Sequence, residues 1–184
     1  MMNWEVAVEA VLLGAALAMD AVAASVALAA AGRWTFNPRR MLITAGLFGL
    51  FQCLMPLIGF YGSSWAGSLV ESYGKYIAGL LLIAIGSKMF SDGESNKKLR
   101  FSLQQLLLLA LATSLDALLV GVSFSFQRRT SIWLDAVIIG FVTALLAWLG
   151  CVTGRWSGKL LGKNCTWPGA LVLVLLGLKI IIFS

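Results

Sequence analysis

The sequence predicts an all-α integral membrane protein, with six transmembrane helices arranged as two inverted three-helix repeats. Of its 184 residues, 60% are hydrophobic and only 12% are charged, whereas a soluble domain carries about 25% charged residues. The apolar stretches recur along the whole chain and are about 20 residues long, which is the length a helix needs to cross a bilayer. Two aspartates at matching places in the two halves indicate the repeat.

Six apolar stretches define the predicted spans. They run from Val6 to Ala31, Met41 to Gly62, Tyr73 to Phe90, Leu103 to Phe126, Ile132 to Thr153 and Pro168 to Phe183. A charged stretch separates the third span from the fourth. We therefore expect a first three-helix repeat over residues 1–91, a cytoplasmic linker over 92–102 and a second three-helix repeat over 103–184.

Matching residues support the repeat. Asp20 and Asp116 are 96 positions apart, and at the same offset Leu12, Leu13, Ala16, Ala21 and Val26 match Leu108, Leu109, Ala112, Ala117 and Val122. Because each half has an odd number of spans, the second half enters the membrane from the opposite side. Such inverted repeats place their binding site near the midplane, at the interface between the halves. Chance similarity between apolar stretches is the alternative explanation.

Basic residues gather on one side of the six spans. That side receives Arg33, Arg39, Arg40, Lys97, Lys98, Arg100, Arg155, Lys159 and Lys163, and the other receives Lys75, Arg128 and Arg129. Since Lys and Arg favour the cytoplasmic side, both termini are expected on the non-cytoplasmic side. Lys88 and Lys179 lie near span ends, where their stems can snorkel. The net charge of +6 therefore reflects orientation in a lipid bilayer, and no nucleic acid partner is expected.

Asp20 and Asp116 each lie in the middle of an apolar span. A carboxylate there costs about 2.5–3.5 kcal/mol on insertion scales and usually marks an ion or substrate path. Helical spacing places Thr113 and Ser123 on the face of Asp116, where their hydroxyls would add oxygen ligands. The alternative is a packing face of small residues, with both aspartates satisfied by serine or backbone groups.

The second span contains a proline, Pro56, which removes one backbone hydrogen bond and frees the carbonyl of Gln52. We expect a helix break at Pro56 that turns the carbonyl and side-chain oxygens of Gln52 toward a cavity, as in other transporters. An ordinary proline kink is an equally good interpretation. Thr143, in the fifth span, could add another hydroxyl.

These groups predict a site for a hard divalent cation. The expected metal ligands are Asp20, Asp116, Gln52, Thr113, Thr143 and Ser123, and the sequence contains no histidine. Oxygen ligands suit Mg²⁺, Ca²⁺ or Mn²⁺, and Met19 is expected to pack in the core. When the site is empty, the two acids should share at least one proton, which metal binding would release. This predicts proton-coupled antiport by alternating access, with no catalytic residue and no cofactor besides the transported ion.

Several segments resemble the MntP manganese efflux pump family. They are the Met-Asp-Ala-x-Ala-Ala-Ser segment Met19–Ser25, the Ala-Thr-Ser-Leu-Asp-Ala segment Ala112–Ala117, the Pro-Leu-Ile-Gly step Pro56–Gly59 and the glycine-spaced stretch Ile139–Lys163. The resemblance implies a multi-pass Mn²⁺ exporter of the bacterial inner membrane, related to the lysine-exporter superfamily, with Asp20 and Asp116 essential. Family members carry Glu where this chain has Gln52, and a sporulation-associated branch shares the motifs, so the motifs do not fix the ion.

Three other functions stay open. The chain could move a different cation or a small solute, as a transporter or a channel. It could be a membrane thiol–disulfide electron carrier, which would need Cys53 and Cys151 to form a reactive pair, although buried cysteines usually serve packing. It could also be a structural subunit, and a homodimer is compatible with any of these readings. Our prediction is a transporter and not an enzyme.

Overall fold

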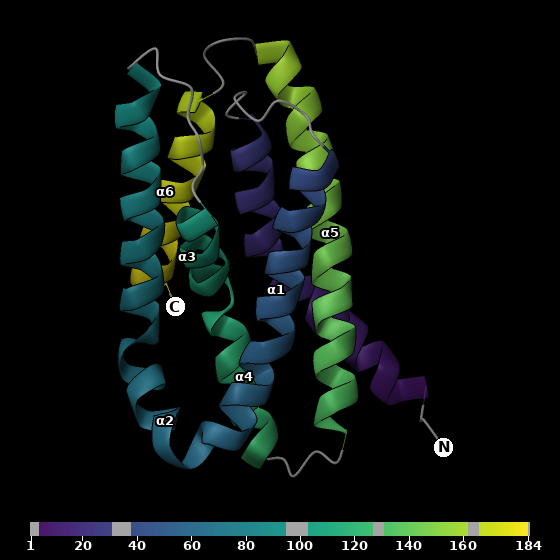
Figure 1. Ribbon diagram of the computed structural model, residues 1–184. Helices are drawn as coiled ribbons and strands as arrows, with labels where there is room; N and C mark the ends of the chain where they lie inside the picture. Colours follow the sequence, from purple (N-terminus) through teal and green to yellow (C-terminus); the bar gives the residue numbers. More distant parts are fainter. Residues whose placement is uncertain (1–3, 31–37, 95–102, 127–130, 162–165, 184) are drawn as a thin grey trace.

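The computed structural model describes residues 4–30, 38–94, 103–126, 131–161 and 166–183 and is helical over these ranges apart from Ser114 and Ser131. The helices are α1 (Trp4–Ala30), α2 (Pro38–Glu94), α3 (Leu103–Thr113), α4 (Leu115–Phe126), α5 (Ile132–Leu161) and α6 (Thr166–Phe183), which form one elongated bundle (Figure 1). The all-α prediction is therefore confirmed. Helices suit this composition because a helix satisfies its own backbone hydrogen bonds in lipid, where no water can do so.

Three of the described helices are long and apolar enough to cross a membrane: Ala7–Ala30 in α1, Pro38–Ser63 in α2 and Ile132–Trp156 in α5. A fourth candidate is the bent pair α3 and α4, if the two are one span. These segments correspond to the predicted first, second, fifth and fourth spans. The predicted third and sixth spans are helical, within α2 and α6, but are not among these candidates, so the count of six spans and the inverted repeat stay predictions.

Helix α2 has two arms. Its 57 residues would extend about 86 Å if straight, nearly three times the hydrocarbon thickness. Figure 1 shows how the chain avoids this length, because the ribbon turns back at the lower end and returns beside α3 and α6. The first arm, Pro38–Ser63, contains Gln52 and Pro56, and it is this arm that lies at the centre of the bundle.

Helix α5 fits between α1 and the first arm of α2 through small residues. A Cβ atom added at Gly49 of α2 would lie 2.7 Å from both the Ala144 Cβ and the Gly140 carbonyl oxygen. On the other side of α5, a Cβ at Gly150 would lie 3.0 Å from the Val22 carbonyl oxygen of α1. Glycines therefore let these backbones approach closely, as is usual for helices packed in membranes.

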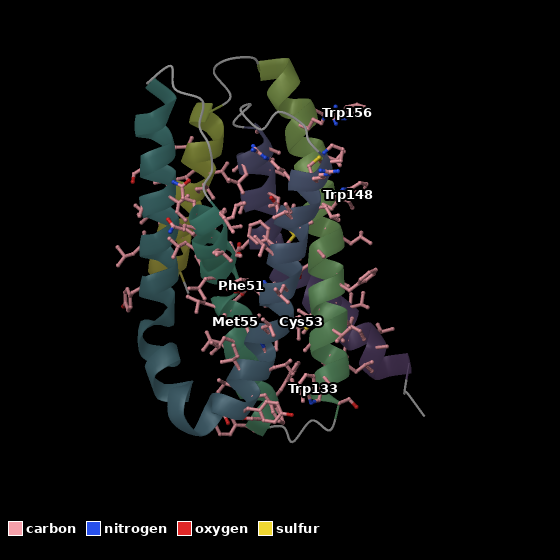
Figure 2. All side chains as sticks on the ribbon, in the orientation of Figure 1. Phe51, Cys53, Met55, Trp133, Trp148 and Trp156 are labelled. Carbon is pink, nitrogen blue, oxygen red and sulfur yellow. The ribbon has the colours of Figure 1, made fainter. Side chains whose placement is uncertain are left out.

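Apolar side chains cover the outside of the bundle as well as its core. Leu12, Leu42, Phe141 and Leu175 are all exposed, and such a surface suits lipid rather than water. Figure 2 places Trp133 toward the lower end of α5 and Trp156 toward the upper end. Tryptophans at the two ends of a span are typical of the two membrane interfaces.

The helix break lies at a different place from the one predicted. Helix α2 continues through Pro56, which is buried inside it, whereas the predicted fourth span is interrupted between α3 and α4 with a bend of 40°. Pro56 costs α2 one hydrogen bond, but tertiary packing against α4 holds that segment helical. At the α3–α4 junction, side-chain hydroxyls compete for the backbone instead.

Candidate functional site

The two predicted acids approach each other at the centre of the bundle. Asp20 lies in the middle of α1, and Asp116 lies in the first turn of α4. Both side chains are partly buried, and the two carboxyl groups are close enough to interact electrostatically. Like charges this close repel unless a cation or a proton lies between them, so the pair is suited to hold a positive ion.

The break between α3 and α4 is built by hydroxyl side chains. Thr113 donates its hydroxyl to the carbonyls of Leu109 and Ala110, and Ser114 donates to the Ala110 carbonyl at 2.8 Å. Such back-bonding weakens and bends helices. The new helix then begins at Leu115, where the Ala117 N–H donates to Asp116 Oδ1 at 2.7 Å. The carboxylate therefore lies at the positive end of α4.

Gln52 connects the two halves. Its side chain is fully buried, and its Nε2 group donates to the Thr113 carbonyl at 3.1 Å and to the Leu17 carbonyl at 3.4 Å. The same side chain also lies within reach of the Asp116 carboxyl group. Its Oε1 atom is buried and has no hydrogen-bond partner. The structure thus places Gln52 beside Asp116 and against the backbone one turn before Asp20.

The three predicted hydroxyls differ in their position. Thr143 of α5 is fully buried, and its Oγ1 atom has no hydrogen-bond partner. Thr113 is buried as well, but its hydroxyl is used within α3 and its carbonyl meets Gln52. Ser123, about two helical turns beyond Asp116, is exposed and donates to the Leu119 carbonyl of its own helix. Helical spacing alone did not distinguish the three.

Lys179 is a residue that sequence reasoning set aside. It lies on α6, which packs against α1, and its ammonium group interacts electrostatically with Asp20. The match between Gly86-x-Lys88 and Gly177-x-Lys179, at an offset of 91, was the available signal. Lys179 itself is exposed, so it lies at the edge of the aspartate site and not in its buried part.

Pro56 has a packing role in the structure. A Cβ atom added at Gly121 of α4 would overlap the backbone carbonyl of Pro56, and one added at Gly59 would overlap the Leu118 carbonyl. These contacts press the first arm of α2 directly onto α4, immediately after Asp116 in the chain. In Figure 2, Phe51 and Met55 extend from α2 toward α3 and α4, and both pack in the apolar cluster around Ala117 and Leu118.

The candidate metal ligands are all oxygen atoms. Among the described residues, no group of three or more His, Cys, Asp or Glu side chains could hold a metal ion. Met19 is 65% exposed, so it is neither a thioether ligand nor the core residue that we expected. Two carboxylates and neutral oxygens suit a hard, hydrated divalent cation better than zinc or copper.

The two cysteines do not form a redox pair. Cys53 and Cys151 are both free thiols. Cys53 lies against Gly140 of α5, and Cys151 is 11 residues farther along that helix, which corresponds to about 16 Å. A disulfide needs Cα atoms within about 7 Å, so this arrangement does not support a thiol–disulfide carrier.

Comparisons with known proteins show the family of this chain. The family described as "Putative manganese efflux pump" matches residues 35–181. Relatives carrying that description and the name MntP include one from Aliarcobacter butzleri, 36% identical over 95% of this chain and 99% of its own. Another, from Methanosarcina acetivorans, is 41% identical over 92% of each chain. No solved structure matches. A transporter, not an enzyme, is the class to which these relatives point, and the chain belongs to the manganese efflux pump family.

Proposed function

We propose that this protein exports Mn²⁺ through a midplane site formed by Asp20 and Asp116. The observation that carries the proposal is the proximity of these two carboxyl groups, one from each half of the chain, which lie near enough to repel each other electrostatically. Two carboxylates neutralise a divalent cation where lipid would otherwise make its charge costly. The relatives that extend over nearly the whole chain are described as manganese efflux pumps.

Further ligands come from buried oxygens that lack partners. Gln52 Oε1 and Thr143 Oγ1 are both buried without a hydrogen bond, and leaving a buried polar atom unpaired costs about 1–3 kcal/mol. A bound ion or its water shell would satisfy such atoms. We assign Gln52 and Thr143 to the ligand set with the two aspartates, and leave out Ser123 and the Thr113 hydroxyl, which are already hydrogen-bonded within their own helices.

Inverted repeats and alternating access are part of this proposal. Gly49 contacts Ala144, which is 95 positions later, close to the offset of 96 between the aspartates. A contact between two residues related by the repeat is what a two-fold axis through the α2–α5 crossing would produce. Rocking of one half against the other about this axis would open the aspartate pair to each side in turn, with protons as the exchanged ion.

The proposed orientation in the inner membrane rests on helix directions. The first arm of α2 runs antiparallel to α5, because Gly49 meets Ala144 while Cys53 meets Gly140. Arg39 and Arg40, at the start of α2, therefore lie at the same end as Arg155 of α5, and basic residues favour the cytoplasm. Helix α1 runs parallel to α5, which sends the N-terminus to the opposite side. The C-terminal location, the lysine-exporter relationship and a homodimer stay predictions from the sequence.

Metal uptake by inside-out vesicles tests the function. With ⁵⁴Mn²⁺ and an imposed pH gradient, we expect uptake and counterflow of protons by the wild type. Asp116→Asn should lower the initial rate at least about 100-fold, since one buried charge partner of the ion is lost. Ser123→Ala, which removes an exposed hydroxyl on the same helix, should transport normally.

Other outcomes would contradict the proposal. Equal uptake by Asp116→Asn would exclude the aspartate site, and uptake insensitive to the pH gradient would exclude proton coupling. Competition by a tenfold excess of Mg²⁺, Ca²⁺ or Cd²⁺ identifies the preferred ion. If one of these blocked uptake more strongly than unlabelled Mn²⁺, the substrate would be that cation.

A further inference from the structure

The two hydrogen bonds of Gln52 reach equivalent places in the two halves. Their acceptors are the carbonyl oxygens of Leu17 and Thr113, which are 96 positions apart, the same offset as Asp20 and Asp116. Each acceptor lies three residues before its aspartate, which is about one helical turn. One buried amide group from α2 therefore connects the backbone of both aspartate-bearing segments at the same register.

The chemistry of the neighbouring groups determines which end of the Gln52 amide faces the two carbonyls. Both main-chain groups are carbonyl oxygens, which only accept hydrogen bonds, so the NH₂ end of Gln52 has to face them. Its two hydrogens serve the Leu17 and Thr113 carbonyls, and the Asp116 carboxyl group is a third acceptor within reach of the same amide. A carboxylate of the same shape has no hydrogen to donate, and it would place a negative charge against two carbonyls and the nearby Asp116.

We call the link from the Gln52 NH₂ group to the Leu17 and Thr113 carbonyls the Gln52 bridge. It lies where α2 packs closely against α4 and α5. Gln52 is placed one turn from Gly49, which contacts α5, and one turn from Pro56, which contacts Gly121 of α4. These close backbone contacts hold α2 between the halves. The NH₂ end of the amide can therefore transmit the position of one aspartate segment to the other, whether or not the Oε1 atom at the other end contacts the ion.

We propose that Gln52 is a positioning residue, whose NH₂ group links the Leu17 and Thr113 carbonyls and so sets the spacing of the two aspartates. This role is separate from any ligand role of its Oε1 atom. Its consequence for transport rests on the proposed function, but the bridge itself does not. During alternating access, the longer contact, to Leu17 at 3.4 Å, is the one we expect to open first.

Hydrogen exchange on the metal-free protein in detergent tests the bridge. The variants are Gln52→Met, which has neither donor nor oxygen, and Gln52→Glu, which keeps two oxygens but loses the donors. We expect the peptides covering residues 17–21 and 113–118 to exchange roughly five- to tenfold faster in both variants, because each lost bond removes about a fivefold protection. Gln104→Met, at the exposed start of α3, should leave both peptides unchanged.

Transport measurements then distinguish the positioning role of Gln52 from a role as metal ligand. If Gln52 positions the aspartates, Gln52→Glu and Gln52→Met should both lose at least about tenfold in maximal Mn²⁺ uptake. With a ligand role alone, the added carboxylate of Gln52→Glu would keep or raise uptake, and exchange would be unchanged in both variants. Faster exchange at one segment only would also overturn the bridge. Faster exchange at both segments in a protein that moved another ion would overturn the Mn²⁺ proposal and keep the bridge.

Discussion

Helix α1 and the α3–α4 pair carry the same aspartate motif, but only α1 is a continuous helix. Asp20 lies inside 27 helical residues, whereas Asp116 follows a break at Ser114. The residues at equivalent positions explain the difference. Leu17 and Ala18 of α1 are good helix formers, while Thr113 and Ser114 use their hydroxyls on their own backbone.

The break gives the two aspartates different electrostatic partners. Asp116 accepts a hydrogen bond from the Ala117 N–H and lies beside the Gln52 amide. Asp20 has no free helix end next to it, and its electrostatic partners are Asp116 and Lys179 of α6. Asp116 is therefore stabilised by backbone and amide dipoles, and Asp20 by the charged ammonium group of Lys179. The two copies of the aspartate motif thus have different electrostatic surroundings within one structure.

The two halves also differ in how closely they pack. Around the broken motif, Gly59 and Gly121 bring the backbones of α2 and α4 into direct contact. Around the continuous motif, Cβ atoms added at Gly150 and Gly154 would lie 3.0 and 2.5 Å from the carbonyl oxygens of Val22 and Val26, so α1 also packs closely against α5, although less closely than α2 packs against α4. A broken helix leaves backbone groups exposed, so a tighter partner is needed to exclude lipid from them.

The largest expected effect is on folding, from Gly121→Ala. The added methyl would overlap the Pro56 carbonyl, and because that partner is backbone it cannot turn away. We expect a loss of about 2–3 kcal/mol in unfolding free energy, measured by titration with SDS in mixed micelles. Gly150→Ala should cost clearly less, and Gly46→Ala, which meets nothing within 4 Å, should be neutral. Equal losses of unfolding free energy for all three variants would contradict the inferred difference in packing between the halves.

An intermediate effect is expected from Ser114→Ala, which gives the second motif the residue that α1 has at Ala18. Removing the back-bonding hydroxyl and adding the best helix former should favour a straighter span by about 0.5 kcal/mol. Hydrogen exchange at residues 115–118 should slow about twofold, and Mn²⁺ uptake should fall.

Ser125→Ala is the matched control for this change. Ser125 donates to the Val122 carbonyl in the same way, but inside an unbroken helix. If Ser114→Ala and Ser125→Ala gave the same exchange and uptake, the hydroxyl at the break would not explain the difference between α1 and α3–α4.

The smallest expected effect is from Lys179→Met, which removes the positive partner of Asp20 and keeps the side-chain length. An exposed charge of this kind is worth little because solvent and salt screen it. The apparent affinity for Mn²⁺ should rise roughly two- to fivefold, with the maximal rate unchanged, in uptake measured against Mn²⁺ concentration. Lys179→Arg should behave as wild type, and a matching rise in that variant would rule out a charge effect.

Much of the fold could be predicted because its signals are local. Hydropathy located α1, the first arm of α2, α5 and the α3–α4 span within a few residues, since each depends only on its own composition. Counting along the chain was enough to relate Asp20 to Asp116 by a fixed offset. The same counting failed for Ser123, because helical spacing gives a direction but not the position of the neighbouring helices.

The sequence by itself determined that this is a polytopic helical membrane protein with two acids at related positions. Only the tertiary structure decided that the break falls at Ser114 instead of Pro56, that Gln52 spans both halves and that Lys179 approaches Asp20. The physical reason is that hydrophobicity and helical periodicity are properties of short segments. Which carbonyl a buried amide reaches, and whether a proline is held helical, depend on backbones that approach from distant parts of the chain.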